Sequence, residues 1–125
     1  MKLPIHNSGE ATTTAAAKLE RAISTSFGRP VTAYLTDCYF LTGCCLGITH
    51  RHVRNDIHGR FADGHRIRTS QIIEAHRYGE FWLLHTYSGS FYVVVTFREE
   101  GGLESLYTML TILLTGVHPA PPSLH

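Results

Sequence analysis

The first regular pattern along the chain is an apolar stripe with helical spacing. Leu19, Ile23 and Phe27 recur every four residues, with charged side chains between them. Gly28 then supplies a helix stop signal, and a proline follows two residues later. The pattern predicts a helix over residues 12–27.

A different pattern follows, in which β-branched and aromatic residues dominate. Residues 31–41 are therefore predicted to form a strand that ends near Gly43. Gly43 and Gly47 bracket a short apolar stretch, which predicts a bend or bulge there before the sheet resumes at 48–53.

Turn signals divide the next part of the chain into a meander. The turns are predicted at 62–64, 78–80 and 88–90, and the strands at 65–75, 81–87 and 91–97. In the last of these strands apolar residues alternate onto both faces. We expect it to be a central strand that is covered on both sides.

A second helix is predicted over 102–115, where leucines fall at helical spacing. Its apolar band is wide, so it either packs deeply on the sheet or covers a second copy of the chain, and we expect a homodimer through this C-terminal helix. The element order predicts one α+β domain over 1–125, with an N-terminal helix, a four- to five-stranded antiparallel sheet and a C-terminal helix. Both helices are expected on one face of the sheet, and the ends, 1–11 and 117–125, are expected to be flexible.

Length and composition fit that single domain. The chain has 125 residues, of which 43% are hydrophobic and 17% charged, enough apolar material for a core. It contains no apolar stretch of about 18 residues, so no membrane contact is expected. Three cysteines, with Cys44 and Cys45 adjacent, do not suit ordinary disulfide pairing, and we expect a cytoplasmic protein.

The charge is distributed unevenly along the chain. The net charge of +1 excludes a strongly basic nucleic-acid binder and an acidic mimic of a phosphate backbone. Residues 50–77, however, hold six arginines against three acidic residues, a charge of +3, whereas the remainder carries −2. Because arginine favours bidentate contacts to carboxylates and phosphates, we predict a partner-binding surface there. Its predicted members are Arg51, Arg54, Arg60, Phe61, Arg66, Arg68 and Arg77.

Other interpretations of this segment stay open. Arg66 and Arg68 would point the same way on a strand, and such a pair also suits a solvated sheet face whose arginine stems lie over apolar neighbours. Aromatic residues accompany the arginines: Phe61 precedes Arg66 and Arg68, and Tyr78, Phe81 and Trp82 follow Arg77. That mixture would equally suit a nucleic-acid-binding module that uses an Arg/His-rich sheet surface.

Candidate metal ligands and nucleophiles lie in or near the same region. Cys44, His50 and His52 are the weak metal candidates, because a His-x-His pair on a strand can share a zinc ion with a thiolate. Their spacing differs from the usual zinc motifs, which favours buried core thiols. Cys38 beside Asp37 lacks any local catalytic signature. We therefore expect no cofactor and a non-enzymatic protein.

Two stretches within residues 57–97 carry a family resemblance. GRFADGHRIRTSQI (59–72) and LLHTYSGSFYVV (83–94) resemble a hairpin pattern seen in small phage and mobile-element accessory proteins, a class that includes anti-CRISPR inhibitors. The resemblance implies a protein that binds and inhibits a host protein or ribonucleoprotein complex, such as a CRISPR-Cas effector, in the cytoplasm of a bacterial host. It implies no catalytic residue.

Overall fold

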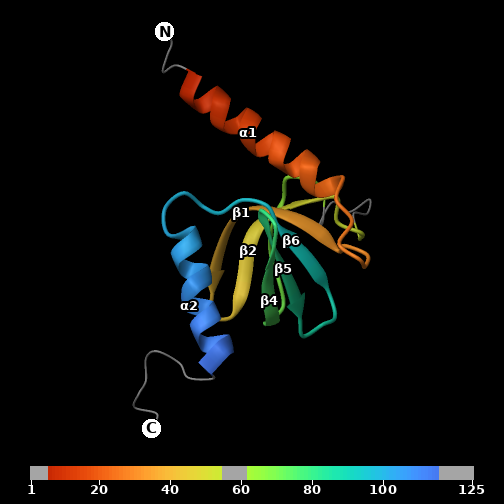
Figure 1. Ribbon diagram of the computed structural model, residues 1–125, viewed down its shortest axis with the longest axis vertical. Helices are drawn as coiled ribbons and strands as arrows, with labels where there is room; N and C mark the ends of the chain where they lie inside the picture. The colour runs from red at the N-terminus through yellow and green to blue at the C-terminus, as the bar shows by residue number, and fades with distance from the viewer. Residues whose placement is uncertain (1–5, 55–61, 116–125) are drawn as a thin grey trace.

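The computed structural model describes residues 6–54 and 62–115 and has the predicted α+β architecture (Figure 1). Its elements are α1 (His6–Ile23), β1 (Ala33–Leu41), β2 (Cys44–His50), β3 (Arg66–Arg68), β4 (Ile72–Tyr78), β5 (Phe81–Thr86), β6 (Phe91–Val94) and α2 (Gly102–Thr115). The predictions for the second helix and for the strands at 81 and 91 agree closely with α2, β5 and β6.

The strands form one mixed sheet in the order β3-β2-β1-β6-β5-β4. Two antiparallel units, β1 to β3 and β4 to β6, are joined at the centre because β1 and β6 pair in parallel. In that pair Ala33 lies opposite Tyr92 and Leu35 opposite Val94. The prediction of four to five antiparallel strands was therefore wrong, because a contact between the first and last strands leaves no turn signal in the sequence.

The predicted strand over 65–75 is two strands, and they lie at opposite edges of the sheet. Thr69 ends the first of them, because its buried hydroxyl accepts a hydrogen bond from the Cys45 N–H at 3.0 Å and donates one to the Ser70 carbonyl at 2.8 Å. Side-chain bonds of this kind compete with the strand ladder. The chain then crosses from β3 to β4 within residues 69–71.

This short connection forces the sheet to curl. In a flat six-stranded sheet the edge strands would be separated by about 24 Å, yet the chain from Arg68 to Ile72 can span at most about 15 Å. The connection is also held at both sides, because the Ile72 N–H donates to the Gly43 carbonyl and the Tyr87 N–H donates to the Gln71 carbonyl, each at 2.8 Å. The sheet consequently has a concave and a convex face.

A β-bulge in β1 keeps its apolar side chains on the concave face. The pairing register with β2 shifts between Thr36 and Tyr39, and Asp37 has a φ of 55°. The extra residue restores the alternation, so that Leu35 before the bulge and Phe40 after it are both buried in the same cluster. Without the bulge, the side chains in the second half of β1 would each point to the opposite face of the sheet.

The predicted bend is confirmed at Gly43 and is wrong at Gly47, where β2 continues without a break. Gly43 belongs to the tight turn between β1 and β2, and Gly47 lies within β2 opposite the bulge. A Cβ at Gly47 would lie 3.1 Å from the Cys38 Sγ atom and 3.2 Å from the Thr36 carbonyl oxygen. The glycine therefore serves close packing.

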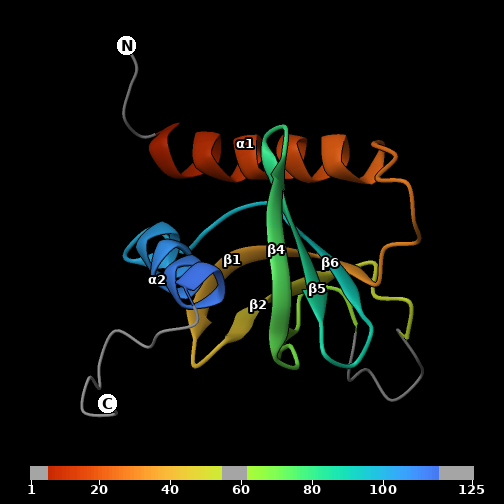
Figure 2. The same ribbon diagram turned by 60° about the horizontal axis from the view of Figure 1, so that its bottom comes forward.

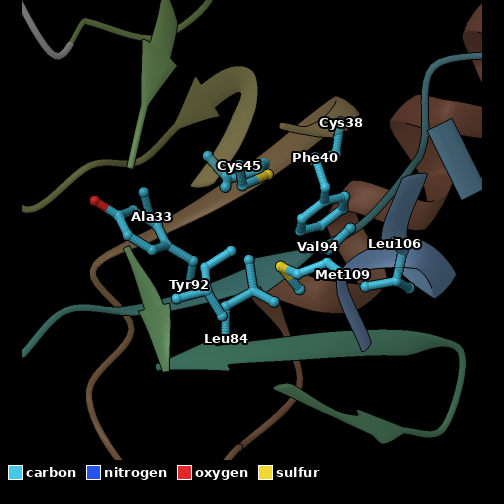
Figure 3. Close-up of a cluster of buried hydrophobic side chains, with 11 residues drawn as sticks. Ala33, Cys38, Phe40, Cys45, Leu84, Tyr92, Val94, Leu106 and Met109 are labelled. Carbon is cyan, nitrogen blue, oxygen red and sulfur yellow. The ribbon is translucent and has the colours of Figure 1, made fainter. Parts of the chain in front are cut away.

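Each face of the sheet has its own core and its own helix. The concave core, to which all six strands and α2 contribute, contains Ala33, Leu35, Cys38, Phe40, Cys45, Ile72, Leu84, Tyr92, Val94, Leu106 and Met109, with Ile67 packed against it (Figure 3). The convex core, against α1, contains Ala22, Phe81, Leu83, Phe91, Val93 and Val95. In Figure 2 α1 runs above the strands, and α2, seen nearly end-on, lies apart from α1 and beside β1.

The expectation that both helices share one face was therefore wrong, although its premise about β6 was confirmed. All four residues of β6 are buried, and the strand is central. A strand that is apolar on both sides needs a cover on each side. One helix on each face meets that need.

The bounds of α1 also differ from the predicted 12–27. The helix begins earlier, at His6, and ends at Ile23, where the hydroxyls of Ser24 and Thr25 donate to the carbonyls of Glu20 and Arg21. These local bonds favour termination. Phe27 nevertheless continues the apolar stripe beyond the end of the helix, since its ring packs against that of Phe81 with the ring centres 6.0 Å apart.

A substitution at Gly102 tests the contact between α2 and the bulge. A Cβ there would lie 2.7 Å from the Cys38 carbonyl oxygen. We expect Gly102→Ala to destabilise the fold in urea unfolding by about 1–3 kcal/mol, the cost typical of overpacking. In open space alanine would instead stabilise the helix by up to about 1 kcal/mol, so a more stable variant would contradict the contact. The control is Thr111→Ala on the exposed side of α2, expected to change stability by less than about 0.5 kcal/mol.

Candidate functional site

The predicted arginine pair lies at an edge of the sheet. Arg66 and Arg68 are both exposed on β3, and Ile67 between them turns inward to the concave core. The prediction that the two side chains point the same way is confirmed, since alternate residues of a strand share a face. Both arginines therefore belong to the convex face.

Rows of side chains cross the convex face from β1 to the β3 edge. Read outward from β1, they are Tyr39, Leu46 and Arg68; Thr36, Ile48 and Arg66; and Tyr34 with His50. The β1 and β2 members are half-buried. Together with Arg51, which follows β2, these eight residues are called the basic face below.

Ion pairing differs among the arginines of the basic face. The Arg66 Nη2 atom lies 3.2 Å from Asp37 Oδ2, with side chains 49% and 40% exposed, so solvent screens this pair and its contribution to stability is small. The Arg68 Nη2 atom donates to Thr42 Oγ1 at 3.1 Å. Within residues 6–54 and 62–115 neither Arg68 nor Arg51 has a carboxylate at ion-pair distance.

The turn that follows β2 positions Arg51. The residue has a φ of 56°, and its backbone N–H donates to Asp63 Oδ1 at 2.7 Å. This hydrogen bond joins the turn at 62–64 to the end of β2 and gives Asp63 a structural role. Burial raises the pKa of the neighbouring Tyr34 hydroxyl, and the positive charge of Arg51 opposes that shift.

The other predicted binding residues are not brought to the basic face. Arg77 lies on β4, at the opposite edge of the sheet, where its Nε atom donates to the Gly79 carbonyl at 3.0 Å. Arg54 lies beside His52 and Tyr92, whose ring belongs to the concave core. Arg60 and Phe61 lie outside the described residues.

Sequence reasoning missed one cation that lies next to the basic face. The Arg98 guanidinium lies over the Tyr39 ring, 4.7 Å from its centre, in a cation–π contact. Arg98 is outside the arginine-rich segment. Only the sheet, through the isolated bridge between Cys38 and Phe97, brings it beside β1.

The candidate metal ligands do not converge. Cys44 and His50 begin and end β2, and the His50 Nε2 atom is hydrogen-bonded to Thr36 Oγ1 at 2.9 Å. The backbone leaves the strand at Arg51, so His52 turns instead toward Tyr92, with ring centres 6.4 Å apart. Among the residues that the structure describes, no three His, Cys, Asp or Glu side chains are grouped to hold a metal ion.

The cysteines are core residues, as expected. All three are free and buried, and Cys38 and Cys45 belong to the concave core. Burial raises the pKa of the Cys38 thiol well above its usual value, and the neighbouring Cys45 adds to that shift. A thiol held in its neutral form is a poor nucleophile.

The two stretches that carry the family resemblance meet in the folded chain. The Ser70 Oγ atom lies 2.9 Å from Ser88 Oγ, which lies 3.2 Å from Thr86 Oγ1. The Ser90 N–H donates to the same threonine oxygen at 3.1 Å. These hydroxyls therefore hold the 69–71 connection against the turn between β5 and β6, a structural role. Residues 59–61 of the first stretch lie outside the described residues.

Comparison with known proteins adds no relative: no family model, curated protein or solved structure matches the chain. In the described part of the chain, neither helix is long and apolar enough to span a membrane.

A second cluster of polar side chains lies where the loop after α1 meets β5. The Arg29 Nη1 atom is hydrogen-bonded to His85 Nδ1 at 3.1 Å, and its guanidinium lies 4.7 Å from the centre of the Phe91 ring. The His76 ring is 5.6 Å from that of His85. Burial lowers the pKa of His85, Arg29 and His76 lower it further, and Glu74 opposes the shift.

This cluster predicts a loss of stability in acid. A histidine whose pKa is lower in the folded than in the unfolded chain loses stability as pH falls below about 6.5, and the loss is complete below the folded pKa. Burial shifts the pKa of His50 and His52 in the same direction. We expect the thermal midpoint to fall between about pH 7.5 and about pH 5, and to fall less in His85→Asn. His65→Asn, an exposed site, is the control, and equal falls in wild type and His85→Asn would contradict the assignment.

Proposed function

We propose that the chain is a non-enzymatic binding protein that docks its basic face on an acidic surface of a partner protein. The observation that supports the proposal is the basic face itself, where two tyrosines lie beside Arg51, Arg66 and Arg68 on a sheet that fixes their backbone. Tyrosine and arginine are favoured at the anchors of protein interfaces. Within the described residues neither Arg51 nor Arg68 has a carboxylate at ion-pair distance, and Asp63 is bonded to the backbone N–H of Arg51.

The resemblance of the stretches at 59–72 and 83–94 suggests what the partner is. We infer a host protein or ribonucleoprotein complex, such as a CRISPR-Cas effector, that is inhibited in the cytoplasm of a bacterial host. Inhibition of this kind needs occupation of a surface and no catalysis. The neutral Cys38 thiol and the scattered histidines are consistent with a protein that acts by binding.

A nucleic acid would bind through the same arginines, but the contacts of Tyr39 and the net charge of the chain favour a protein partner. The Tyr39 ring already carries the Arg98 guanidinium on its face, so a base could stack there only after displacing it. The net charge of +1 also gives little general attraction to a polyanion.

Charge reversal at the β3 edge tests the proposal. The double variant Arg66→Glu and Arg68→Glu should lose capture of the host complex from a lysate, because it would present like charges to an acidic surface. Arg77→Glu is the matched control on the opposite edge strand and should keep wild-type capture. Equal loss in both variants, or no loss in either, would contradict docking through the basic face.

A salt titration with the purified partner decides between the two classes of partner. Each phosphate contact adds about 0.7 to 0.9 to the slope of log affinity against log salt concentration. We expect a shallower slope for an acidic protein surface than for a run of phosphates. A slope that corresponds to many phosphate contacts would favour the nucleic-acid alternative.

We also propose that α2 pairs with α2 of a second copy. Leu103, Tyr107 and Leu114 form an outward stripe on this helix and are 42%, 50% and 84% exposed. Glu104 is the only charged residue between Gly102 and Thr115, so two such helices bring little charge repulsion to a symmetric contact.

The mass in light scattering tests this contact. The wild type should give the mass of a dimer, and Tyr107→Glu with Leu114→Glu should give that of a monomer, because both changes place charge in an apolar contact. The matched control is Tyr87→Glu, an 82% exposed tyrosine that follows β5 and is not part of α2. A monomeric wild type, or a dimer that survives the double change, would overturn the proposal.

A further inference from the structure

A cavity of about 340 Å³ lies at the end of the concave core, where α2 faces the turn between β1 and β2. Its walls come from three separate parts of the chain, namely that turn, the 69–71 connection with the start of β4, and α2. The lining residues are Phe40, Leu41, Thr42, Gly43, Gln71, Ile72, Ser105, Thr108, Met109, Ile112 and Leu113. Figure 3 shows Phe40 and Met109 side by side at this end of the core. The volume falls within the range of sites that bind small molecules.

The interior of the cavity is apolar. Six of the lining side chains are aliphatic or aromatic or a thioether, and none is charged. The Ser105 hydroxyl is already satisfied, because it accepts from the Phe40 N–H at 2.8 Å and donates to the Gly102 carbonyl at 2.6 Å. The Thr108 hydroxyl donates to the Glu104 carbonyl at 3.2 Å. The walls therefore suit an alkyl chain, and the flexible Met109 can adapt to its shape.

The polar residues that line the cavity are neutral, and one positive charge lies next to them without lining the cavity itself. Thr42 lines the cavity, and its Oγ1 atom holds the Arg68 guanidinium at 3.1 Å. Arg68 has no carboxylate at ion-pair distance within the described fold. The Gln71 side chain lies against Gly43, where its amide is 3.3 Å from the position that a Cβ would take. An anionic group bound beside Thr42 would therefore lie near the Arg68 guanidinium, which reaches Thr42 from the convex face.

We propose that this cavity binds an anionic amphiphile, a fatty-acid-like monocarboxylate, with its alkyl chain inside and its carboxylate at Arg68. The guanidinium is complementary in charge and geometry to a carboxylate. The enclosure by a helix, a turn and a connecting segment favours a small molecule over a flat protein surface. This site is independent of docking through the rest of the basic face.

Titration calorimetry with decanoate tests the proposal, with decan-1-ol as the uncharged probe of the same chain length and butyrate as the short one. Decanoate should bind to the full chain more tightly than decan-1-ol, and butyrate should not bind measurably. Arg68→Gln should weaken the binding of decanoate by up to about fivefold, as expected for an exposed charge pair, and should leave the binding of decan-1-ol unchanged. Arg66→Gln, on the same strand and face, is the matched control and should bind as the wild type does.

A second variant, in which a larger side chain fills the cavity, tests the same proposal. Ile112→Trp should abolish binding of both ten-carbon probes while circular dichroism still shows a folded chain. Should that variant not fold, amide shifts in the wild type decide instead: decanoate should move the signals of Gly43, Gln71 and Met109. The proposal would be overturned if decanoate did not bind, if it bound no more tightly than decan-1-ol, or if Arg68→Gln had no effect on its affinity. Amide shifts confined to other parts of the chain would overturn it too, as would a cavity that only a partner protein occupies.

Discussion

The structure depends on one connection, the three residues 69–71 that join the two edges of the sheet. Hydrogen bonds hold this connection on both sides, to β2 through Thr69 and Cys45 and to the turn between β5 and β6 through Gln71 and Tyr87. A connection of this length is compatible only with a curled sheet. The curl creates the enclosed core, and it leaves β3 as a short edge strand whose two arginines face outward.

The β-bulge at Asp37 complements the curl. It lets the long strand β1 keep Leu35 and Phe40 in one core, and it brings Tyr39 to the convex face, where the tyrosine lies in line with Arg68. The start of α2 packs against the bulge through Gly102. The basic face and the cavity therefore lie on either side of the same turn, which explains how Arg68 can contribute to both.

Local features could be predicted from the sequence, and long-range pairing could not. The leucine spacing of α2 and the turns around β5 and β6 are local signals, and the α+β class, the shared direction of Arg66 and Arg68 and the burial of the cysteines followed from such signals. The parallel pairing of β1 with β6 leaves no mark in the sequence. That pairing decided which arginines lie together, so Arg77 was grouped with Arg66 although the two occupy opposite edges. Arg98 was missed for the same reason, since only the fold brings it to Tyr39.

Hydrogen exchange at the connection tests the central feature most directly. The amides of Thr69, Ile72 and Tyr87 donate to the carbonyls of Cys45, Gly43 and Gln71 at 2.9, 2.8 and 2.8 Å. If the connection holds the curled sheet, these amides should exchange as slowly as those of the central strands β1 and β6. Exchange at the rate of exposed loop amides would contradict the curl, and with it the placement of the basic face and the cavity.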